Sequence, residues 1–518
     1  MGIIENKDKD MEKQVRVRFA PSPTGPLHIG GVRTALYNYL FAKKHNGQFI
    51  LRIEDTDQGR LVSGAEEYII ETFDWLGIKF DEGIREGGSF APYRQSDRKS
   101  IYKDYAMQLV EKGWAYYAFD TPEELEAIRK TYELEKKNFQ YDNLTRTQMR
   151  NSISLNQTQV KELLDKETPY VIRFKFPENT EIKLHDMIRK EVVMNTNILD
   201  DKVLYKSDGM PTYHLANVVD DHLMQITHVI RGEEWLPSCP LHVMLYKAFG
   251  WENTMPQFAH LPLLLKPDGN GKLSKRDGDR LGFPVFPLQW EDPKTQEISS
   301  GYRESGYLPK AVINFLALLG WNPGGEKELF KIEELIDLFS MERISKGGAK
   351  FDLEKAKWFN HQYIQMEQNQ TLAKELLKVL AEKNLNFPME YVEKVVGQIK
   401  ERCNFTNDFW DQSYFFFIAP NNYDEKVVKK HWKAETPTYL EQITQLLNSN
   451  TYSTTEEIDH LLHDYIKDND LNMGNIMNTL RLVLVGKSMG PSISEIIFVI
   501  GKEETLGRIG NAIKHINI

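Results

Sequence analysis

The segment from residue 16 to residue 31 constrains the fold more than any other part of this 518-residue chain. Apolar side chains alternate from residue 15 to residue 19, which predicts a buried strand. Prolines and glycines between residues 21 and 26 end it, because proline cannot donate to a β-ladder and glycine permits a tight reversal. Apolar residues then recur at helical spacing from residue 32 to residue 41. This order predicts the first β–α crossing of a nucleotide-binding sheet.

Residues at this crossing suit a phosphate ligand. His28 can hydrogen-bond a phosphate, and Gly30 and Gly31 let a ligand approach the backbone closely. We also expect free N–H groups at the start of the helix to face outward, where they attract an anion. The Gly-x-Gly-x-x-Gly pattern of dinucleotide-binding folds is absent here. Taken alone, a His-x-Gly-Gly sequence is more often a structural turn, so a second motif has to support it.

A basic segment far downstream supplies that second motif. Lys272, Ser274 and Lys275 lie in a polar, glycine-flanked stretch, which predicts a mobile basic loop. Such a run is usually a solvated surface loop. Paired with His28, its lysines could instead neutralise the phosphates of a nucleotide.

Composition limits the class of protein. The length predicts about two to four domains, and 41% apolar with 27% charged residues are typical of a soluble globular protein. The formal net charge of −10 argues mildly against a nucleic-acid partner, although a local basic face is enough to bind RNA. Cys239 and Cys403 cannot form a disulfide framework or a four-thiolate zinc site, which fits a reduced cytosol. We find neither a signal peptide nor an apolar run near the ~18 residues of a membrane span.

The predicted elements alternate between strand and helix, which implies a parallel sheet covered by helices. Further strands are expected at 49–53, 212–217 and 227–230, and helices at 97–112 and 238–249. Between them, Ser63 and Glu66 have the spacing of a capping box, and the helix they begin should end at Gly77.

Three parts of the chain depart from this alternation. Charged helical stretches and apolar runs within residues 115–206 predict a separate α+β insertion, with strands at 170–176, 192–194 and 203–205. Residues 282–293 are rich in aromatics, and we expect a surface insertion that packs its own aromatics rather than a partner site. Beyond about residue 368, apolar residues recur at helical spacing and predict a helical bundle.

The two motifs, His28-Ile-Gly-Gly31 and Lys272-Leu-Ser-Lys-Arg276, resemble the HIGH and KMSKS signatures of class I aminoacyl-tRNA synthetases. Further segments resemble the bacterial glutamyl-tRNA synthetase family, in the right order over nearly the whole chain: residues 18–25, 52–57, 213–217 and 229–235. The resemblance implies an α/β fold with a Rossmann-type parallel-sheet catalytic domain, an α+β connective insertion and an all-α C-terminal anticodon-binding domain. The boundaries it implies are 1–114 and 207–265 for the two catalytic halves, 115–206 for the acceptor-end insertion, 266–375 for the stem-contact region with the basic loop, and 376–518 for the anticodon-binding domain.

The resemblance also implies the site residues. Catalytic roles fall to His28, Gly30, Lys272, Ser274 and Lys275. ATP is expected to contact His28, Gly30, Glu234, Trp235, Leu236, Lys272 and Lys275. Glutamate is expected to contact Arg18, Ala20, Ser22, Glu54, Tyr213, Asn217 and Arg231. A carboxylate side chain calls for a planar, bidentate cation, which is why arginines fit this role.

The implied reaction is ATP-dependent activation of L-glutamate, followed by transfer of the glutamyl group to the terminal adenosine of tRNA(Glu). Positioning and positive charge carry such phosphoryl chemistry, with Mg²⁺ bridging phosphate oxygens. Some relatives bind zinc through cysteines near the start of the insertion, but residues 116–122 contain none, so we expect no zinc site. A cytoplasmic monomer is also implied.

Three alternatives compete with this interpretation. A paralogue that modifies an anticodon base would lack the helical C-terminal part. A glutaminyl-tRNA synthetase would carry β-barrels there and would lack an arginine at position 231. A non-catalytic RNA-binding protein would have no physical need for His28, Lys272 and Lys275 together.

Overall fold

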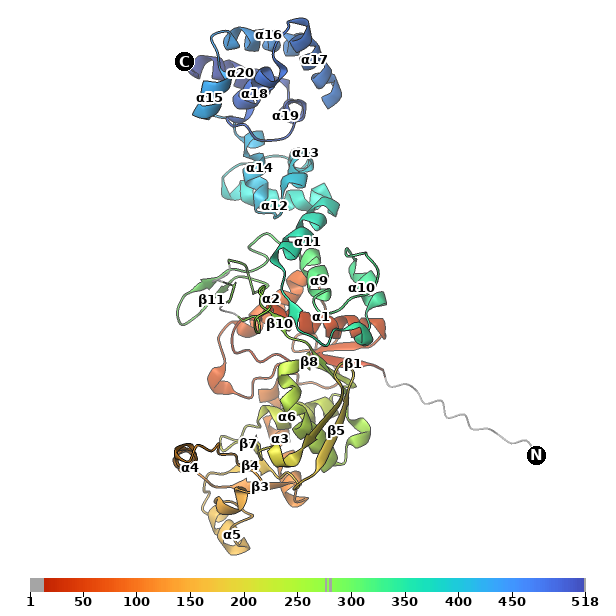
Figure 1. The fold of residues 1–518 in the computed structure, drawn as a ribbon, viewed down its shortest axis with the longest axis vertical. Helices are drawn as coiled ribbons and strands as arrows, with labels where there is room; N and C mark the ends of the chain where they lie inside the picture. Colours follow the sequence, from red (N-terminus) through yellow and green to blue (C-terminus); the bar gives the residue numbers. More distant parts are fainter. Residues whose placement is uncertain (1–13, 275–276, 279–281, 517–518) are drawn as a thin grey trace, which may run out of the picture. The chain divides into compact units, whose positions relative to one another are not determined.

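A six-stranded, mostly parallel sheet forms the centre of the catalytic part of the chain (Figure 1). The computed structural model describes residues 14–274, 277–278 and 282–516. In sheet order the strands are β2 (Gln48–Leu51), β1 (Arg16–Phe19), β8 (His228–Gly232), β9 (Gln257–Leu261), β5 (Glu181–Asp186) and β6 (Lys190–Asn195). Only the β5–β6 edge pair is antiparallel. The α/β prediction is confirmed.

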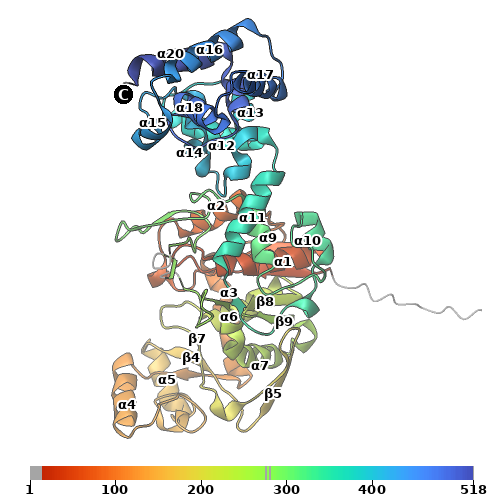
Figure 2. The same ribbon diagram turned by 45° about the horizontal axis from the view of Figure 1, so that its top comes forward.

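Helices cover both faces of this sheet, because right-handed crossovers leave β1 and β8 in opposite directions along it. One face carries α1 (Ile29–Lys44), and α6 (Tyr213–Leu223) and α7 (Cys239–Phe249) lie on the other (Figures 1 and 2). Further helices of this part are α2 (Ala65–Leu76), α3 (Lys99–Glu111), α9 (Pro309–Ala317) and α10 (Ile332–Leu338). The short pairs β10 (Leu264–Leu265) with β13 (Ala349–Lys350) and β11 (Trp290–Glu291) with β12 (Ile298–Ser299) complete it.

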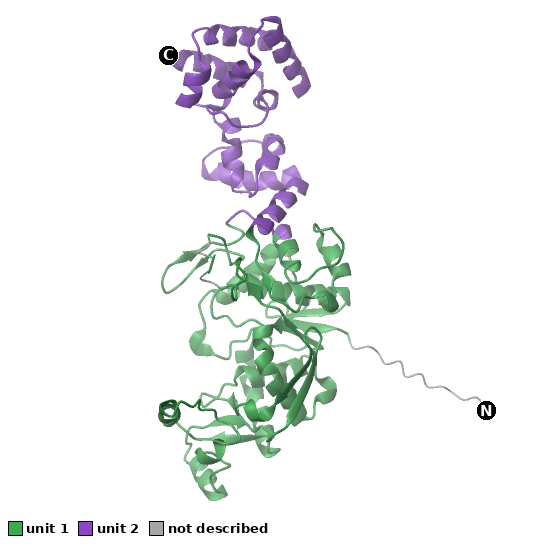
Figure 3. Cartoon of the chain, viewed as in Figure 1, with its two compact units in different colours: residues 1–304, 312–353 green, residues 305–311, 354–518 purple. Residues whose placement is uncertain are grey.

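The chain divides into two compact units (Figure 3). The first contains residues 1–304 and 312–353, and the second contains residues 305–311 and 354–518. The finer division into five segments stays a prediction.

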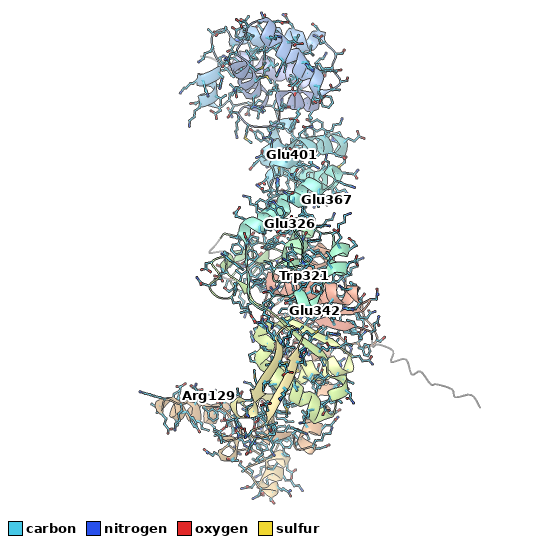
Figure 4. The ribbon with its side chains drawn as sticks, turned by 45° about the vertical axis from the view of Figure 1, so that its right-hand side comes forward. Arg129, Trp321, Glu326, Glu342, Glu367 and Glu401 are labelled. Atoms are coloured by element: carbon cyan, nitrogen blue, oxygen red, sulfur yellow. The ribbon has the colours of Figure 1, made fainter. Side chains whose placement is uncertain are left out.

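The insertion has its own antiparallel sheet, in the order β3 (Ala115–Ala118), β4 (Val171–Phe174) and β7 (Val203–Tyr205). Beside it lie α4 (Pro122–Leu134), which carries Arg129, and α5 (Gln157–Asp165) (Figure 4). The expectation that residues 192–194 join this sheet is wrong. They belong to β6, which forms a hairpin with β5 on the edge of the central sheet. A short apolar run predicts a strand but does not specify its partner.

Two local predictions in the catalytic part are also wrong. Residues 213–217 are not a strand but the first turns of α6, where Leu215, Val218 and Val219 are buried at helical spacing. The capping box of Ser63 and Glu66 does not form, since α2 begins after Gly64 and Glu66 instead pairs with Arg94. The predicted end of α2 at Gly77 is confirmed, with φ at 69°.

The second unit is entirely helical in its described residues after 354, as predicted. Its helices are α11 (Leu353–Met366), α12 (Asn369–Glu382), α13 (Met389–Ile399), α14 (Asp408–Phe417), α15 (Glu425–His431), α16 (Thr436–Ser449), α17 (Thr455–Asp468), α18 (Met473–Val485), α19 (Ile493–Ile500) and α20 (Lys502–His515). Nowhere in the described chain is a helix long and apolar enough to cross a membrane.

Residues 283–304 pack against the catalytic part rather than only against themselves, which corrects the expectation for 282–293. The Tyr68 hydroxyl on α2 donates to the Leu288 carbonyl at 2.5 Å and accepts from the Leu288 N–H at 3.0 Å. The Trp290 ring meets the Tyr68 ring edge-on at 5.3 Å. The Leu288 backbone and the Trp290 ring therefore fix this segment to Tyr68 on α2.

The buried face of α12 allows a test of the bundle. Leu376 is fully buried, whereas Leu377 on the same helix is only half-buried. Leu376→Ala should lower the free energy of unfolding by about 2–5 kcal/mol, because it removes buried methyl groups and leaves a cavity. Leu377→Ala is the matched control and should lower it by clearly less. Denaturant unfolding followed by circular dichroism measures both, and equal losses would contradict this packing.

Candidate active site

His28 caps the first helix and closes its amino end. Its backbone is extended, and its Nδ1 accepts the Gly30 N–H at 3.0 Å, while its carbonyl accepts the Gly31 and Val32 N–H groups. The Ile29 N–H donates to the Val285 carbonyl at 3.0 Å. The expectation that these helix N–H groups face outward and free is therefore wrong. Two sets of acceptors occupy these N–H groups: the side chain and carbonyl of His28, and the carbonyl of Val285 in the segment after the basic loop.

Asp221, at the end of α6, joins two arginines, one on strand β1 and one directly after the neighbouring strand β2. Arg18 on β1 donates through Nε and Nη2 to the two carboxylate oxygens, at 3.0 and 3.2 Å. Arg52, which follows β2, donates through Nη1 at 2.7 Å to Asp221 and through Nη2 at 2.8 Å to Glu54. Glu54 also accepts from the Asn217 amide at 2.9 Å. All five side chains are buried, so this is a continuous internal network.

Electrostatics keeps Arg52 and Asp221 charged. Burial would lower the pKa of Arg52, but the carboxylates of Asp221, Glu54 and Asp220 outweigh it and hold that pKa well above its ordinary value. Burial would raise the pKa of Asp221, and the adjacent Arg18 and Arg52 reverse this, so the pKa is lowered. Arg52 and Asp221 thus stabilise each other's charged forms.

Arg231, on β8, is held from three sides. Its Nε donates to His260 Nε2 at 3.0 Å, its Nη1 to the Tyr213 hydroxyl at 2.8 Å, and its Nη2 to the Trp235 carbonyl at 3.4 Å. The Trp235 ring lies 4.5 Å from the Tyr213 ring. Burial, the largest influence, raises the pKa of Tyr213 to about 12, so the phenol stays neutral beside the guanidinium.

The basic loop begins in a β-bridge between Lys272 and Leu265. Lys272 Nζ lies 3.0 Å from a carboxylate oxygen of Glu234, and both side chains are about half exposed. The Ser274 N–H and hydroxyl donate to Asp277 at 2.9 and 2.6 Å, and Lys266 Nζ lies 3.3 Å from the same carboxyl group. Lys275, predicted to be catalytic, lies outside the described residues.

The structure therefore joins most of the predicted residues into two groups. One group contains two hydrogen-bonded sets that influence each other electrostatically: Arg18, Glu54 and Asn217, joined through Asp221 and Arg52, and Arg231 with Tyr213 and Trp235. The other is the Lys272–Glu234 pair. Gly30 is tied to His28 at the start of α1. Ala20 and Leu236 are half-buried, and Ser22 is exposed.

Comparisons with known proteins agree with this arrangement. Residues 14–358 match the family model for class I tRNA synthetases (E and Q), catalytic domain, and residues 367–513 match an anticodon-binding domain model. The chain belongs to the class I tRNA synthetases of the E and Q type.

Curated and structural relatives are similar over nearly the full length. A glutamate–tRNA ligase from Porphyromonas gingivalis is 60% identical over 97% of this chain and 99% of its own. One from Flavobacterium johnsoniae is 57% identical with the same coverage. The crystal structure of a glutamate tRNA ligase from Elizabethkingia meningosepticum, in complex with its amino acid, is 53% identical with a TM-score of 0.93, covering 98% of this chain and all of that one.

Sequence reasoning on this synthetase missed the partners of its arginines. Asp221 binds Arg18 and Arg52, His260 accepts from Arg231, and Asp186 in turn binds His260 at 2.6 Å. One signal was present: Asp220 and Asp221 follow two valines on an apolar helical stretch, where unpaired acids would be costly. His260 and Asp186 have no comparable local signal.

The formal charges of the buried group suit an anion. Arg18 and Arg52 are paired with the carboxylates of Asp221 and Glu54, whereas the direct partners of Arg231 are an imidazole, a phenol and a backbone carbonyl. The charge of Arg231 lies in a buried environment, where a ligand carboxylate gains more than in water. The arrangement can therefore bind a small acid and orient it.

Removing the shared carboxylate tests this network. Asp221→Asn should lower the free energy of unfolding by about 3–5 kcal/mol, because Arg18 and Arg52 are then buried with too little compensating charge. Asp74→Asn is the matched control, since it breaks an exposed pair with Arg85 and should cost less than about 1 kcal/mol. Chemical denaturation measures both, and an Asp221→Asn protein as stable as the control variant would contradict the argument.

Proposed function

We propose that this chain is a glutamate–tRNA ligase. It activates L-glutamate with ATP to glutamyl-adenylate and diphosphate, and it then transfers the glutamyl group to the 3′-terminal adenosine of tRNA(Glu). The observation that carries the proposal is the buried Arg231, whose Nε is committed to His260. Each terminal nitrogen makes one internal contact, with the Tyr213 hydroxyl or the Trp235 carbonyl, and has a second N–H for a planar fork to a carboxylate. The names of the full-length relatives support the same substrate.

The proposed glutamate pocket combines opposite charges. The side-chain carboxylate binds Arg231, with Arg18 as the second cation. The α-ammonium group binds Glu54, whose carboxylate is fixed by Arg52 and Asn217. Tyr213 lines the pocket beside Arg231, and Ala20 and Ser22 contribute from the loop after β1. A neutral glutamine amide cannot satisfy the fork in the same way, because one of its two atoms is itself a donor.

The proposed ATP site lies between the start of α1 and the basic loop. His28 contributes its imidazole, and Gly30 leaves room for the phosphates. Lys272, Ser274 and Lys275 approach from the loop, while Glu234, Trp235 and Leu236 lie near the adenosine. Because the helix N–H groups have internal partners, the lysines and the imidazole carry the phosphate contacts.

Mg²⁺ is proposed to accompany ATP. The carboxylates of the two groups are already bound, Glu54 and Asp221 by arginines and Glu234 by Lys272, and Asp277 in the basic loop accepts from Ser274. This donor set suits a magnesium ion held mainly by phosphate oxygens. The ion supplies charge neutralisation when it is bound.

The remaining parts of the proposal concern the tRNA. Residues 115–206 contact its acceptor end, residues 266–375 contact the stem, and residues 376–518 contact the anticodon. The match of residues 367–513 to an anticodon-binding domain supports the last role. A monomer in the cytoplasm, without a zinc site, completes the proposal.

ATP–pyrophosphate exchange tests the function. The assay compares glutamate with glutamine, each with and without tRNA. We expect exchange only with glutamate and only when tRNA is present, as in synthetases that need tRNA before activation. Exchange with glutamate but without tRNA would keep the chemistry and point to the tRNA-independent paralogue. No exchange under any condition would contradict the proposal.

Arg231→Ala tests the specificity argument. It should reduce glutamate-dependent exchange by roughly a hundredfold or more, because a charged, bidentate contact is lost. ATP binding, measured separately by equilibrium methods, should change far less, because Arg231 touches the proposed ATP site only through a 3.4 Å contact with the Trp235 carbonyl. In the described contacts it does not reach the Lys272–Glu234 pair. Arg85→Ala, at an exposed ion pair, is the matched control and should behave like the unaltered protein. Unchanged glutamate kinetics in Arg231→Ala would overturn the assignment.

A further inference from the structure

Three buried side chains on neighbouring strands form a line that ends at Arg231. The register of β8 and β9 places Arg231 directly opposite His260, so in these parallel strands both side chains lie on the same face. The next strand, β5, ends at Asp186, which pairs in register with Phe258 on β9. Arg231, His260 and Asp186 are all at most 5% exposed. The sheet itself thus brings the three residues together.

Asp186 is fixed at the outer end of this line. Its Oδ1 accepts the N–H groups of Ile188 and Arg189 at 2.9 and 2.8 Å. Its Oδ2 lies 2.6 Å from His260 Nδ1 and 3.2 Å from the His260 backbone nitrogen. With this many donors around it, the carboxylate has one orientation. It therefore determines the orientation of the histidine ring.

The carboxylate also determines which ring nitrogen of His260 carries the proton. A hydrogen on Nδ1 donates to Asp186, which leaves Nε2 as an acceptor for the Nε–H of Arg231 at 3.0 Å. Burial and the cation of Arg231 lower the pKa of His260, although Asp186 opposes them. A neutral ring is required, because a protonated one would direct a second N–H at the guanidinium.

We propose that Asp186 and His260 are positioning residues that set the orientation of the Arg231 fork and thereby the preference for glutamate over glutamine. The inference rests on the proposed function, since it assigns to Arg231 the side-chain carboxylate of the substrate. A guanidinium can turn about its own chain, and bidentate binding requires one of these orientations. With Nε held by His260 on β9, the two terminal nitrogens lie against the Tyr213 hydroxyl and the Trp235 carbonyl.

Substitutions at His260 separate positioning from packing. His260→Leu fills the space but removes the acceptor. It should raise the KM for glutamate by roughly ten- to a hundredfold while the KM for ATP stays within about twofold. It should also lower the ratio of kcat/KM for glutamate to kcat/KM for glutamine. His260→Gln offers an amide oxygen near the place of Nε2 and should restore much of the glutamate KM.

A second variant keeps the proposal testable if His260→Leu does not fold. Asp186→Asn preserves shape but no longer requires a hydrogen on His260 Nδ1, so the other tautomer competes. We expect the same selective rise in the glutamate KM. His228→Gln is the matched control, because His228 lies on the same strand as Arg231 but at its opposite end, beside Thr227 and Phe41.

The outcomes distinguish this inference from the proposed function. If the unaltered protein shows no glutamate-dependent exchange, the proposed function fails. If it is active and the folded Asp186→Asn protein keeps its glutamate KM and its selectivity against glutamine, together with any His260→Leu protein that folds, the positioning role is overturned. Equal rises in the KM for glutamate and for ATP would indicate a structural role only and would also overturn it. Thermal melts confirm that each variant is folded.

Discussion

The carboxylate of Asp221 is the interaction on which the rest of the catalytic part depends. It lies at the end of α6 and neutralises Arg18 from β1 and Arg52 from the segment after β2. Two guanidinium groups cannot be buried side by side without such a partner. The same contact therefore closes α6 onto the sheet and assembles the binding group. The same electrostatic contact therefore serves folding and the proposed recognition of glutamate.

The network also explains why Arg18 differs from Arg231. Arg18 gives two of its nitrogens to Asp221, so it contributes mainly charge to a ligand. Arg231 gives its Nε to a neutral histidine and one terminal nitrogen to a neutral phenol. Neutral partners orient a cation without cancelling its charge. Arg231 is thus the arginine whose full charge is left for an anionic ligand, which suits the specificity role proposed for it.

Much of the fold could be predicted because its determinants are local. The strand, turn and helix around His28 follow from proline, glycine and apolar spacing within some thirty residues, and the helical second unit follows from periodicity. The predictions were wrong where contacts between residues far apart in the sequence determine the structure. Glu66 pairs with Arg94 instead of capping its helix, and β6 pairs with the edge of the central sheet instead of the insertion. The segment 212–217, expected as a strand, instead begins α6, whose apolar side chains are buried at helical spacing over the longer stretch from Tyr213 to Leu223.

The candidate site divides in the same way. The resemblance of short motifs was enough to name Arg231, Glu54 and Lys272. The partners that orient the arginines come from other elements: His260 on β9 accepts from Arg231, and Asp221 on α6 pairs with Arg18 across 203 positions of sequence. A single sequence carries no information on such pairings beyond the general cost of burying an unpaired charge.

The two groups of the site differ in how firmly they are held. The arginines and Glu54 are buried and multiply hydrogen-bonded, so the geometry of the proposed glutamate pocket is preorganised. The Lys272–Glu234 pair is about half exposed, and such pairs contribute roughly 0–1 kcal/mol. Under the proposed function, a triphosphate with several negative charges competes easily for that lysine. Lys272 would then exchange the carboxylate of Glu234 for a phosphate at little cost, while the proposed glutamate pocket keeps its geometry.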